Sequence, residues 1–500
     1  MQLTSASRIQ SKHPRFRFCL AAITIVAAPW IAPSPASGRG AAAWTDPFAN
    51  EDDWGKVIKP KAKGTATPKQ KPKAKPKRHP KQEEERQQEE QGPGEQEQPQ
   101  QEREQEQEQE QEQEEIIRRP TKARQRPQDS EASPSGNLSV RASTEVSAYS
   151  DTDAVHVLSP TISGSVADEV AGWSIGGSYL VDAVSAASVD IVSTASSHWV
   201  EQRHVGAASA SFNAGPAAVA LAGGFSREPD YLSISGGGVI SFELAEKNVM
   251  PFVGGSYGHD LVGRTGDPMN IWPQMNTVSL KLGVTFVVNR STIASLSFDE
   301  ILERGYLAKP YRYLPVVPPG VGLQVPAGAS IDLVKSLNVY SVAENVPTER
   351  NRYALSGKLA YRSGNATFRG DQRLYYDSWG LMASTTDVHE YIDLSSSVLV
   401  WPHLRAHVQN GVVFWRRITE QIASPVGPPG IPTYRAGDRE LGPLYTLTGG
   451  LGTRIRLNSD IHAPWTLSFQ VDGIYTRYLD AIYITRRWAM FGALGLEAAF

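Results

Sequence analysis

From about Asn137 to its last residue, the chain alternates apolar and polar residues with a period of two, and this pattern restricts the fold more than any other feature. Between residues 278 and 288, Val278, Leu280, Leu282, Val284, Phe286 and Val288 alternate with Ser279, Lys281, Gly283 and Thr285. The same alternation recurs in 353–362 and 465–472. Since successive side chains of a strand point to opposite faces, these segments are predicted to be strands with one apolar face. Each is about as long as the 9–11 residues of a tilted membrane-crossing strand.

The connections between the predicted strands alternate between short and long. Tight turns are expected near 167–170, 213–216, 245–248, 289–291, 363–365, 401–403 and 458–460, with longer connections at 182–195, 259–275, 301–349 and 417–441. Membrane barrels have short periplasmic turns and long outer loops. The fold predicted for 137–500 is therefore an all-β, transmembrane, antiparallel up-and-down β-barrel of about sixteen strands. A soluble β-sandwich or propeller also alternates, and what stands against it is the combination of the loop parity with a signal peptide and an aromatic carboxy-terminus, none of which would suffice alone.

The carboxy-terminal strand places Leu494, Leu496, Ala498 and Phe500 on one face. An amphipathic last strand that ends on an aromatic residue resembles the assembly signal of bacterial outer-membrane barrels, with Phe500 as its key residue. Other aromatic residues gather near predicted strand ends, where they are expected to form interfacial girdles. These are Trp173, Tyr179, Trp199, Tyr375, Tyr376, Trp379, Trp401, Trp415, Trp465 and Trp488.

The first 136 residues are expected to lie outside the barrel. Residues 1–43 have the basic start, apolar run and small residues of a signal peptide, with cleavage near Ala36 or Ala43. The chain's single cysteine, Cys19, lies in this segment, so the mature protein is expected to have no disulfide, catalytic thiol or cysteine metal site.

Residues 44–136 are predicted to be a disordered periplasmic arm, Lys/Pro-rich over 56–81 and Glu/Gln-rich over 82–115. The arm is either a tether to the cell wall or to a periplasmic protein, or a low-complexity extension without a specific partner, and composition favours the second. Nucleic acid is not an expected partner, because the signal peptide removes the lysines from the cytoplasm.

No catalytic, cofactor or metal site is predicted. Ser185, Asp182 and either His198 or His204 could be combined into a triad, but no G-x-S-x-G sequence surrounds the serine. The histidines are scattered, the acidic pairs lack the spacing of a calcium loop, and no phosphate-binding glycine loop is present. The protein is therefore not expected to be an enzyme.

Alternation places several basic side chains inside the barrel. They are Lys281, Lys358, Arg362, Arg369, Arg373, Arg454 and Arg456, against the inward acids Asp371, Asp472 and Glu497. An excess of cations in a pore favours anions. Alternatively, these charges pair across neighbouring strands and stiffen the interior, and the sequence leaves both interpretations open.

Three segments, 179–188, 304–311 and 373–380, carry the strings D-x-V-S-x-A-S, G-Y-x-x-x-P-Y and Y-Y-D-x-W-G. Together they resemble an uncharacterised family of Gram-negative outer-membrane β-barrel proteins, over about 137–500. The resemblance implies a fold and a location but no activity. On this topology the segments meet the outer rim, as a shared site or as loop braces, and turn chemistry favours braces. The residues concerned are Asp182, Ser185, Ser188, Tyr306, Pro310, Tyr311, Asp377 and Trp379.

The function expected from the sequence is a channel or transporter for small solutes in the outer membrane, with both termini periplasmic. Its expected partners are outer-membrane lipid, the barrel-assembly machinery and an unknown solute. The Pro-rich loop 301–349 is expected to fold inward as a constriction or to cover the mouth. A non-conducting structural or envelope-anchoring barrel is the alternative, and an outer-membrane enzyme is a distant third.

Overall fold

The computed structural model describes residues 138–186, 199–425, 427–458 and 463–500, all within one of the two compact units of the chain. The predicted signal peptide, the predicted arm, Ser188 and His198 lie outside these residues. No helix in the described part of the chain is long and apolar enough to cross a membrane.

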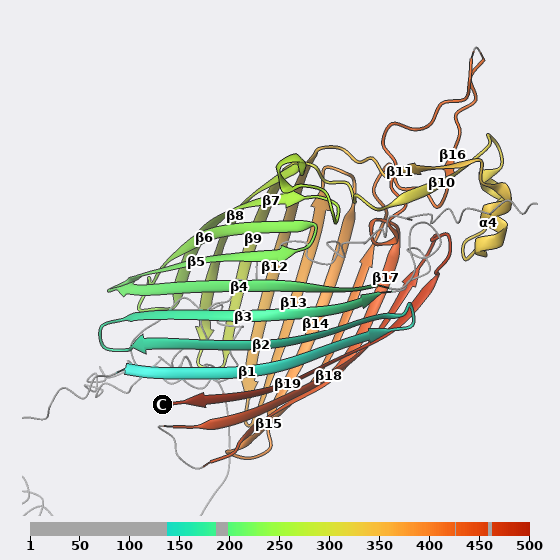
Figure 1. Cartoon of the computed structure of the whole chain (residues 1–500). Coiled ribbons are helices and arrows are strands. Elements are labelled where there is room, and N and C mark those ends of the chain that lie inside the picture. Colours follow the sequence, from blue (N-terminus) through green and yellow to red (C-terminus); the bar gives the residue numbers. More distant parts are fainter. Residues whose placement is uncertain (1–137, 187–198, 426, 459–462) are drawn as a thin grey trace, which may run out of the picture. The chain divides into compact units, whose positions relative to one another are not determined.

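The described strands form a closed antiparallel barrel of sixteen strands, as predicted (Figure 1). They are β1 (Leu138–Asp151), β2 (Val155–Asp168), β3 (Trp173–Ala186), β4 (Trp199–Ala214), β5 (Ala217–Glu228), β6 (Tyr231–Phe242), β7 (Val249–Val262), β8 (Gln274–Asn289), β9 (Thr292–Gly305), β12 (Glu349–Ser363), β13 (Ala366–Asp377), β14 (Met382–Asp393), β15 (Val398–Gln409), β17 (Leu444–Arg456), β18 (Trp465–Tyr478) and β19 (Arg486–Ala499). Consecutive barrel strands pair with each other, and β1 pairs with β19 to close the ring.

One predicted turn is wrong. Trp401 and His403 lie inside β15, and the turn between β14 and β15 is formed by 394–397 instead. Pro402 suggested a turn because proline cannot donate a ladder hydrogen bond. In the structure it is an exposed member of the strand, opposite Leu451 of β17.

Closure of the barrel involves the last residue. The backbone N–H of Phe500 donates to the Val140 carbonyl at 2.8 Å, and the Val140 N–H donates back at 3.1 Å. The Phe500 ring lies edge-on to Trp465, with ring centroids 6.4 Å apart. The final aromatic residue thus joins the first and last strands at the end of the barrel that carries the short turns.

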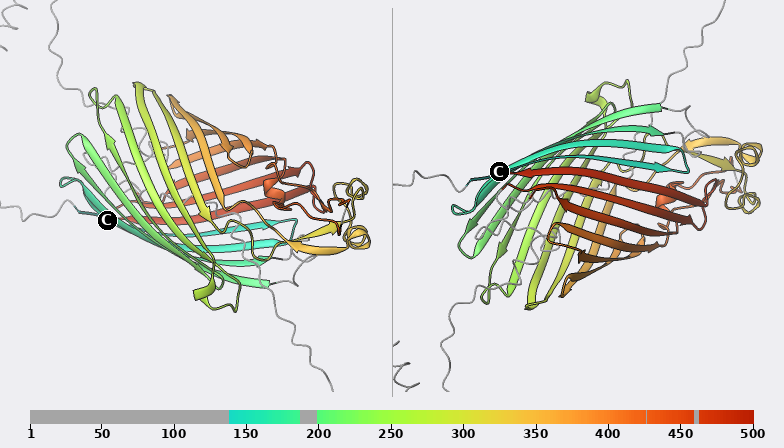
Figure 2. Two further views of the ribbon diagram at one scale, coloured as in Figure 1. Left: turned by 90° about the horizontal axis from the view of Figure 1, so that it is seen from above. Right: turned by 90° about the horizontal axis from the view of Figure 1, so that it is seen from below.

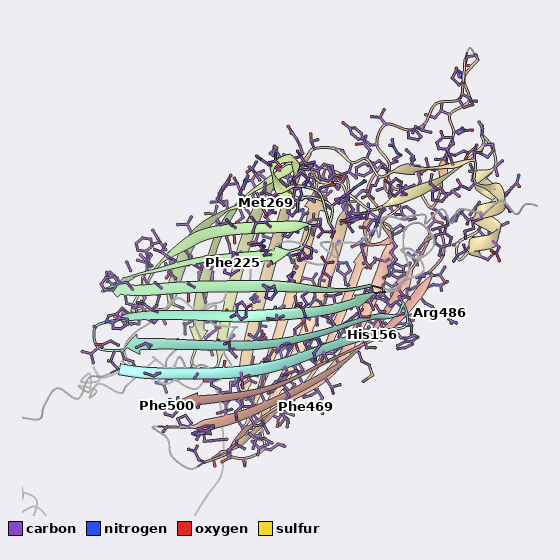
Figure 3. All side chains as sticks on the ribbon, in the orientation of Figure 1. His156, Phe225, Met269, Phe469, Arg486 and Phe500 are labelled. Atoms are coloured by element: carbon purple, nitrogen blue, oxygen red, sulfur yellow. The ribbon has the colours of Figure 1, made fainter. Side chains whose placement is uncertain are left out.

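The outer face of the barrel is apolar along its length. Large exposed side chains occur at alternate positions on successive strands, for example Leu158, Ile162, Ile234, Leu296 and Leu404, and Phe225, Phe469 and Phe500 also lie on this face (Figure 3). In water, each such side chain would forfeit about 1.5–3 kcal/mol relative to burial. A continuous belt of this kind fits lipid rather than water.

Aromatic residues border this belt, but not all of those predicted. Outward aromatic side chains lie toward one end at Phe212, Phe242, Tyr361 and Trp465, and toward the other at Tyr179, Tyr257, Tyr376 and Trp488. Trp379 and Trp415 instead pack in a buried loop cluster. Trp401 and Tyr375 occupy inward positions of β15 and β13. Whether an aromatic residue near a strand end faces lipid, the lumen or a loop cluster depends on strand parity and loop packing. Proximity to the strand end alone does not decide it.

The long connections emerge at one end of the barrel. Besides η2 (Met269–Ile271), they contain β10 (Tyr313–Val317), η3 (Gly322–Gln324), α4 (Ile331–Leu337), β11 (Tyr340–Ala343), β16 (Thr419–Glu420) and η4 (Arg439–Leu441). Strands β11, β10 and β16 form a separate three-stranded sheet. This sheet and α4 project beyond the strand ends (Figure 1, Figure 2), so the alternative in which this part of the loop folds inward is not observed.

We call the two long connections, 306–348 and 410–443, the cap. The cap has apolar cores of its own. Val317, Val325, Val334 and Ile418 form one cluster, against which Ile482 from the β18–β19 connection packs. The cap is therefore a folded structure and not a pair of loose loops.

Candidate lumen and mouth

The inward face of the barrel carries two chemically different walls. The small-residue wall consists of the inward positions at the centre of β4–β7, which are Ala207, Ser209, Ser211, Ala220, Ala222, Gly224, Ser233, Ser235, Gly237, Gly254, Ser256 and Gly258. The charged wall consists of inward positions on β12–β15, which are Arg350, Arg352, Lys358, Arg362, Arg369, Asp371, Arg373, Asp377, Asp387, His389, Asp393, His403, Arg405 and His407. Strands β8 and β9 separate the two walls on one side.

The lumen is accessible to water along the charged wall. The inward side chain of Arg373 is 44% exposed, although it lies within the closed ring of strands. Arg405 on β15 and Glu145 on β1 are likewise exposed at inward positions. Charged groups keep such exposure only where solvent reaches them, so the side chains do not fill the interior at these positions.

All seven basic residues predicted to line the lumen occupy inward positions, and at least three of them are ion-paired. Arg362 contacts Asp393 at 2.6 Å, Arg369 contacts Asp371 at 3.2 Å, and Arg373 contacts Asp299 at 2.8 Å. The remaining four are Lys281, Lys358, Arg454 and Arg456.

The expected excess of inward cations is not found in the described strands. Carboxylates that the sequence reasoning did not count also face inward, and they are at least as numerous as the basic residues. They include Glu145, Asp299, Glu303, Asp387 and Asp393. Among the described residues, Lys281, Arg405 and Arg456 form no ion pair, so they are the inward cations least compensated by a neighbour. Arg405 was missed because the predicted turn at 401–403 obscured the parity of its strand.

Asp377 is the centre of a buried network at the outer end of the charged wall. It is fully buried and accepts hydrogen bonds from Arg350 Nε (2.8 Å), from the Tyr375 hydroxyl and from the backbone N–H groups of Trp379 and Leu381. The Arg350 guanidinium also lies over the Trp379 ring, 4.4 Å from its centroid. These contacts hold the β13–β14 turn in place.

Tyr311 anchors the cap to a distant turn. Its hydroxyl donates to Asp230 in the β5–β6 turn at 2.7 Å and accepts from the Thr265 N–H at 2.6 Å. Arg264 donates to the Pro310 carbonyl. Tyr306 is held through its backbone N–H, which donates to the Gln274 carbonyl. These residues of the second motif therefore brace the loop.

Asp182 braces neighbouring strands. It accepts a hydrogen bond from Ser159 at 2.5 Å and pairs with Arg203 at 2.8 Å. His204 lies on the outer face, where its Nδ1 contacts the Tyr179 hydroxyl at 2.7 Å, and Ser185 is also at an outward position. Asp182 is thus on the opposite face of the barrel wall from Ser185 and His204. In the described part of the chain no hydrogen bond or ion pair joins Asp182, Tyr311 and Asp377, so the structure does not unite them in one rim site.

An ionic cluster fastens the two halves of the cap together. Asp438 pairs with Lys309 and, at 2.7 Å, with Arg312, while Glu344 accepts from the Lys309 backbone N–H. Burial would raise the pKa of Asp438, but Arg312 and Lys309 outweigh it and hold this pKa well below its usual range. The next residue, Arg439, reaches Asp153 in the β1–β2 turn at 2.8 Å. The sequence offered no signal for these pairs, because the partners lie on separate loops.

Residues 270–477 match the model of a family described as a protein of unknown function (DUF3570). This range contains the charged wall and both cap loops, whereas β1–β7 precede it. No curated protein matches the chain in sequence.

The solved structures that match this chain share little sequence with it. A bacterial polysaccharide outer membrane secretin has 8% identity and a TM-score of 0.38, covering 73% of this chain and 98% of its own. OpdK from Pseudomonas aeruginosa has 6% identity and a TM-score of 0.34, covering 73% and 99%. A TodX monoaromatic hydrocarbon channel mutant has 9% identity and a TM-score of 0.32, covering 73% and 90%.

Proposed function

We propose that this protein is a channel for small polar solutes in the outer membrane of a Gram-negative bacterium. The observation that carries the proposal is the exposure of charged side chains, Arg373 and Arg405 among them, inside a closed barrel with an apolar outer belt. The end with short turns, where both barrel termini lie, is assigned to the periplasm, since outer-membrane barrels have this polarity. Phe500 is the residue that the barrel-assembly machinery would recognise.

The proposed solutes are small and polar, with a modest preference for anions. Most inward charges are compensated by an ion pair, which keeps the field of the wall weak. Lys281, Arg405 and Arg456 form no ion pair with any described residue, so they are the groups that would attract an anion. Lys281 lies opposite Gly254 of the small-residue wall, which leaves space beside it.

The cap supports a second candidate, a non-conducting structural barrel. It has its own apolar cores and is tied by Tyr311 to the β5–β6 turn and by Arg439 to the β1–β2 turn. A cap held on several sides could restrict the mouth permanently. Conduction decides between the two candidates.

The test is single-channel recording of the refolded full-length protein in planar bilayers, with the reversal potential measured across a KCl gradient. We expect steady conductance and a mild anion preference. Arg405→Glu should shift the reversal potential toward cation selectivity, most clearly near 0.1 M salt, where the Debye length is about 10 Å. Arg486→Glu makes the same charge change on an exposed, outward side chain and should have little effect (Figure 3).

Absence of conductance from a protein shown to be folded would favour the structural barrel. Conductance without any response to Arg405→Glu would leave a pore but contradict its assigned selectivity.

A further inference from the structure

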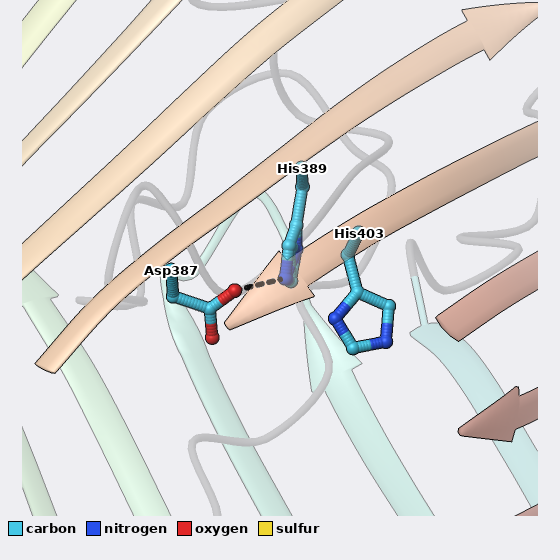
Figure 4. A group of neighbouring side chains, drawn as sticks. All are labelled: Asp387, His389 and His403. Carbon is cyan, nitrogen blue, oxygen red and sulfur yellow. Dashed lines mark hydrogen bonds and ion pairs between the residues drawn. The ribbon is translucent and has the colours of Figure 1, made fainter. Parts of the chain in front are cut away.

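Two histidines and an aspartate converge on the charged wall. Asp387 and His389 occupy successive inward positions of β14, and His403 of β15 lies directly opposite His389 in the strand pairing. One ligand atom from each of the three side chains lies within 4.8 Å of the other two. Figure 4 shows the two imidazoles and the carboxylate facing one another. The arrangement follows from strand register, so it rests on the rigid part of the fold.

His403 is oriented by a group behind it. Its Nε2 lies 2.8 Å from an oxygen of Asp472 on β18, and Asp472 also accepts from Gln470 at 3.0 Å. A carboxylate partner requires a proton on Nε2 of the neutral ring, which leaves the lone pair on Nδ1. The carboxylate–histidine pair is the usual support for an imidazole that binds a metal through its other nitrogen.

The remaining nitrogen of His403 is buried without a partner. Its side chain is only 8% exposed, and within the described residues nothing donates a hydrogen bond to Nδ1. In Figure 4 this nitrogen points toward His389. A buried acceptor that makes no hydrogen bond costs about 1–3 kcal/mol. A bound cation would remove that cost.

His389 is placed to complete the group. Its Nε2 lies 3.1 Å from Asp387 Oδ1, its Nδ1 lies 3.4 Å from the Tyr391 hydroxyl, and its ring centroid is 4.8 Å from that of His403. Two cations lie on adjacent strands. Arg369, opposite His389, is already paired with Asp371, and Arg405 is opposite Asp387. A purely structural His–Asp network would explain the contacts of His389, but it does not explain the unused nitrogen of His403.

We propose that Asp387, His389 and His403 bind a divalent transition-metal ion in the lumen. Two imidazoles and one carboxylate suit Zn²⁺ and related ions, and three protein ligands leave a coordination position for water or a passing solute. Asp472 acts as a positioning residue for His403. This assignment does not depend on whether the barrel conducts.

The experiment is a Zn²⁺ titration of the refolded full-length protein after treatment with EDTA, followed by calorimetry and by metal analysis of the dialysed protein. We expect one bound ion per chain. His403→Gln should abolish this binding, and Asp472→Asn should weaken it by about 10–100-fold. The matched control is His407→Gln, which changes another inward histidine of β15 that contacts Thr385 and Gln409 and leaves binding intact.

Absence of stoichiometric binding in the wild-type protein would overturn the proposal, as would equal binding by His403→Gln and His407→Gln. Heat-dependent gel mobility establishes that each variant is folded. If His403→Gln does not fold, the site is tested instead by the visible absorption spectrum of Co²⁺ added to the wild-type protein. Visible absorption bands of nitrogen- and oxygen-ligated Co²⁺ support the site, and their absence refutes it.

Discussion

The two walls of the barrel differ in what they contribute. The small-residue wall of β4–β7 offers space and few charges at its centre, whereas the charged wall of β12–β15 offers ion pairs, histidines and exposed guanidinium groups. A solute in such a lumen meets a densely charged surface at β12–β15 and a surface of small residues at the centre of β4–β7. The comparison indicates that substitutions on β12–β15 can change the ion selectivity of the lumen, whereas substitutions on β4–β7 can change its width.

The outer loops repeat the same division. Both cap loops leave from strands that bound or belong to the charged wall, whereas within the small-residue wall β5 and β6 are joined by the two-residue turn 229–230. Asp230 in that turn receives Tyr311 from the cap. The cap is therefore built by one side of the barrel and supported by the other.

The largest loss of stability is expected from a substitution at the most buried point of the charged wall. Asp377→Ala leaves Arg350 buried without its carboxylate and should lower the free energy of unfolding by about 3–5 kcal/mol. Ser235→Ala on the small-residue wall should change it by less than about 0.5 kcal/mol. Urea unfolding followed by gel mobility measures both values. Similar losses in the two variants would show that the walls do not differ in this respect.

A smaller effect is expected from filling the open side of the lumen. Ala222→Trp should lower single-channel conductance by about a factor of two or more, because the indole occupies solute space, and should leave the reversal potential unchanged. Leu221→Trp places the same group on the lipid face and serves as the control. Unaltered conductance in Ala222→Trp would mean that this wall does not border the solute path.

The smallest expected effect is that of acid pH on the stability of the cap. The pKa of Asp438 is depressed, so its contribution to cap stability is present above the ordinary aspartate pKa of about 3.9 and is lost only as pH falls below it. Burial raises the pKa of Glu344, and protonation of that group favours the folded cap as pH falls. The lowered pKa of Asp438 and the raised pKa of Glu344 both predict that the cap does not lose stability between pH 7 and 5.

Hydrogen exchange of the backbone in 306–312, corrected for the intrinsic effect of pH, measures this stability. Asp438→Asn should raise the exchange rate at pH 7, which shows that the assay detects loosening. Faster corrected exchange of the unaltered protein at pH 5 would contradict the assignment.

The features of this fold that depend on local periodicity were predictable from sequence. Alternation alone identified the inward position of Arg373 and the outward position of Leu282, because a strand has a period of two. What required strand register was missed. His389 and His403 face each other only because the turn lies at 394–397. The predicted turn at 401–403 gave the wrong cross-strand partners for this hairpin.

Contacts between separate loops were also beyond the sequence. Asp438 pairs with Lys309 across a large separation along the chain, and neither residue lies in a periodic segment. Trp379 and Trp415 were assigned to a lipid interface because tryptophan is common there, although they pack in a buried cluster between the β13–β14 turn and the cap. The contacts of Asp182, Tyr311 and Asp377 are those of braces, the role that turn chemistry, which is local, already favoured.

The pairing of β1 with β19 has a consequence for biogenesis. The first strand of the barrel has a neighbour on one side as soon as β2 exists, but its other edge must wait for the last residues of the chain. Until then the ring is an open sheet with two unpaired edges, which are prone to aggregation. The barrel can therefore close only after the last strand is available, and the final pairing event joins the two ends of the barrel.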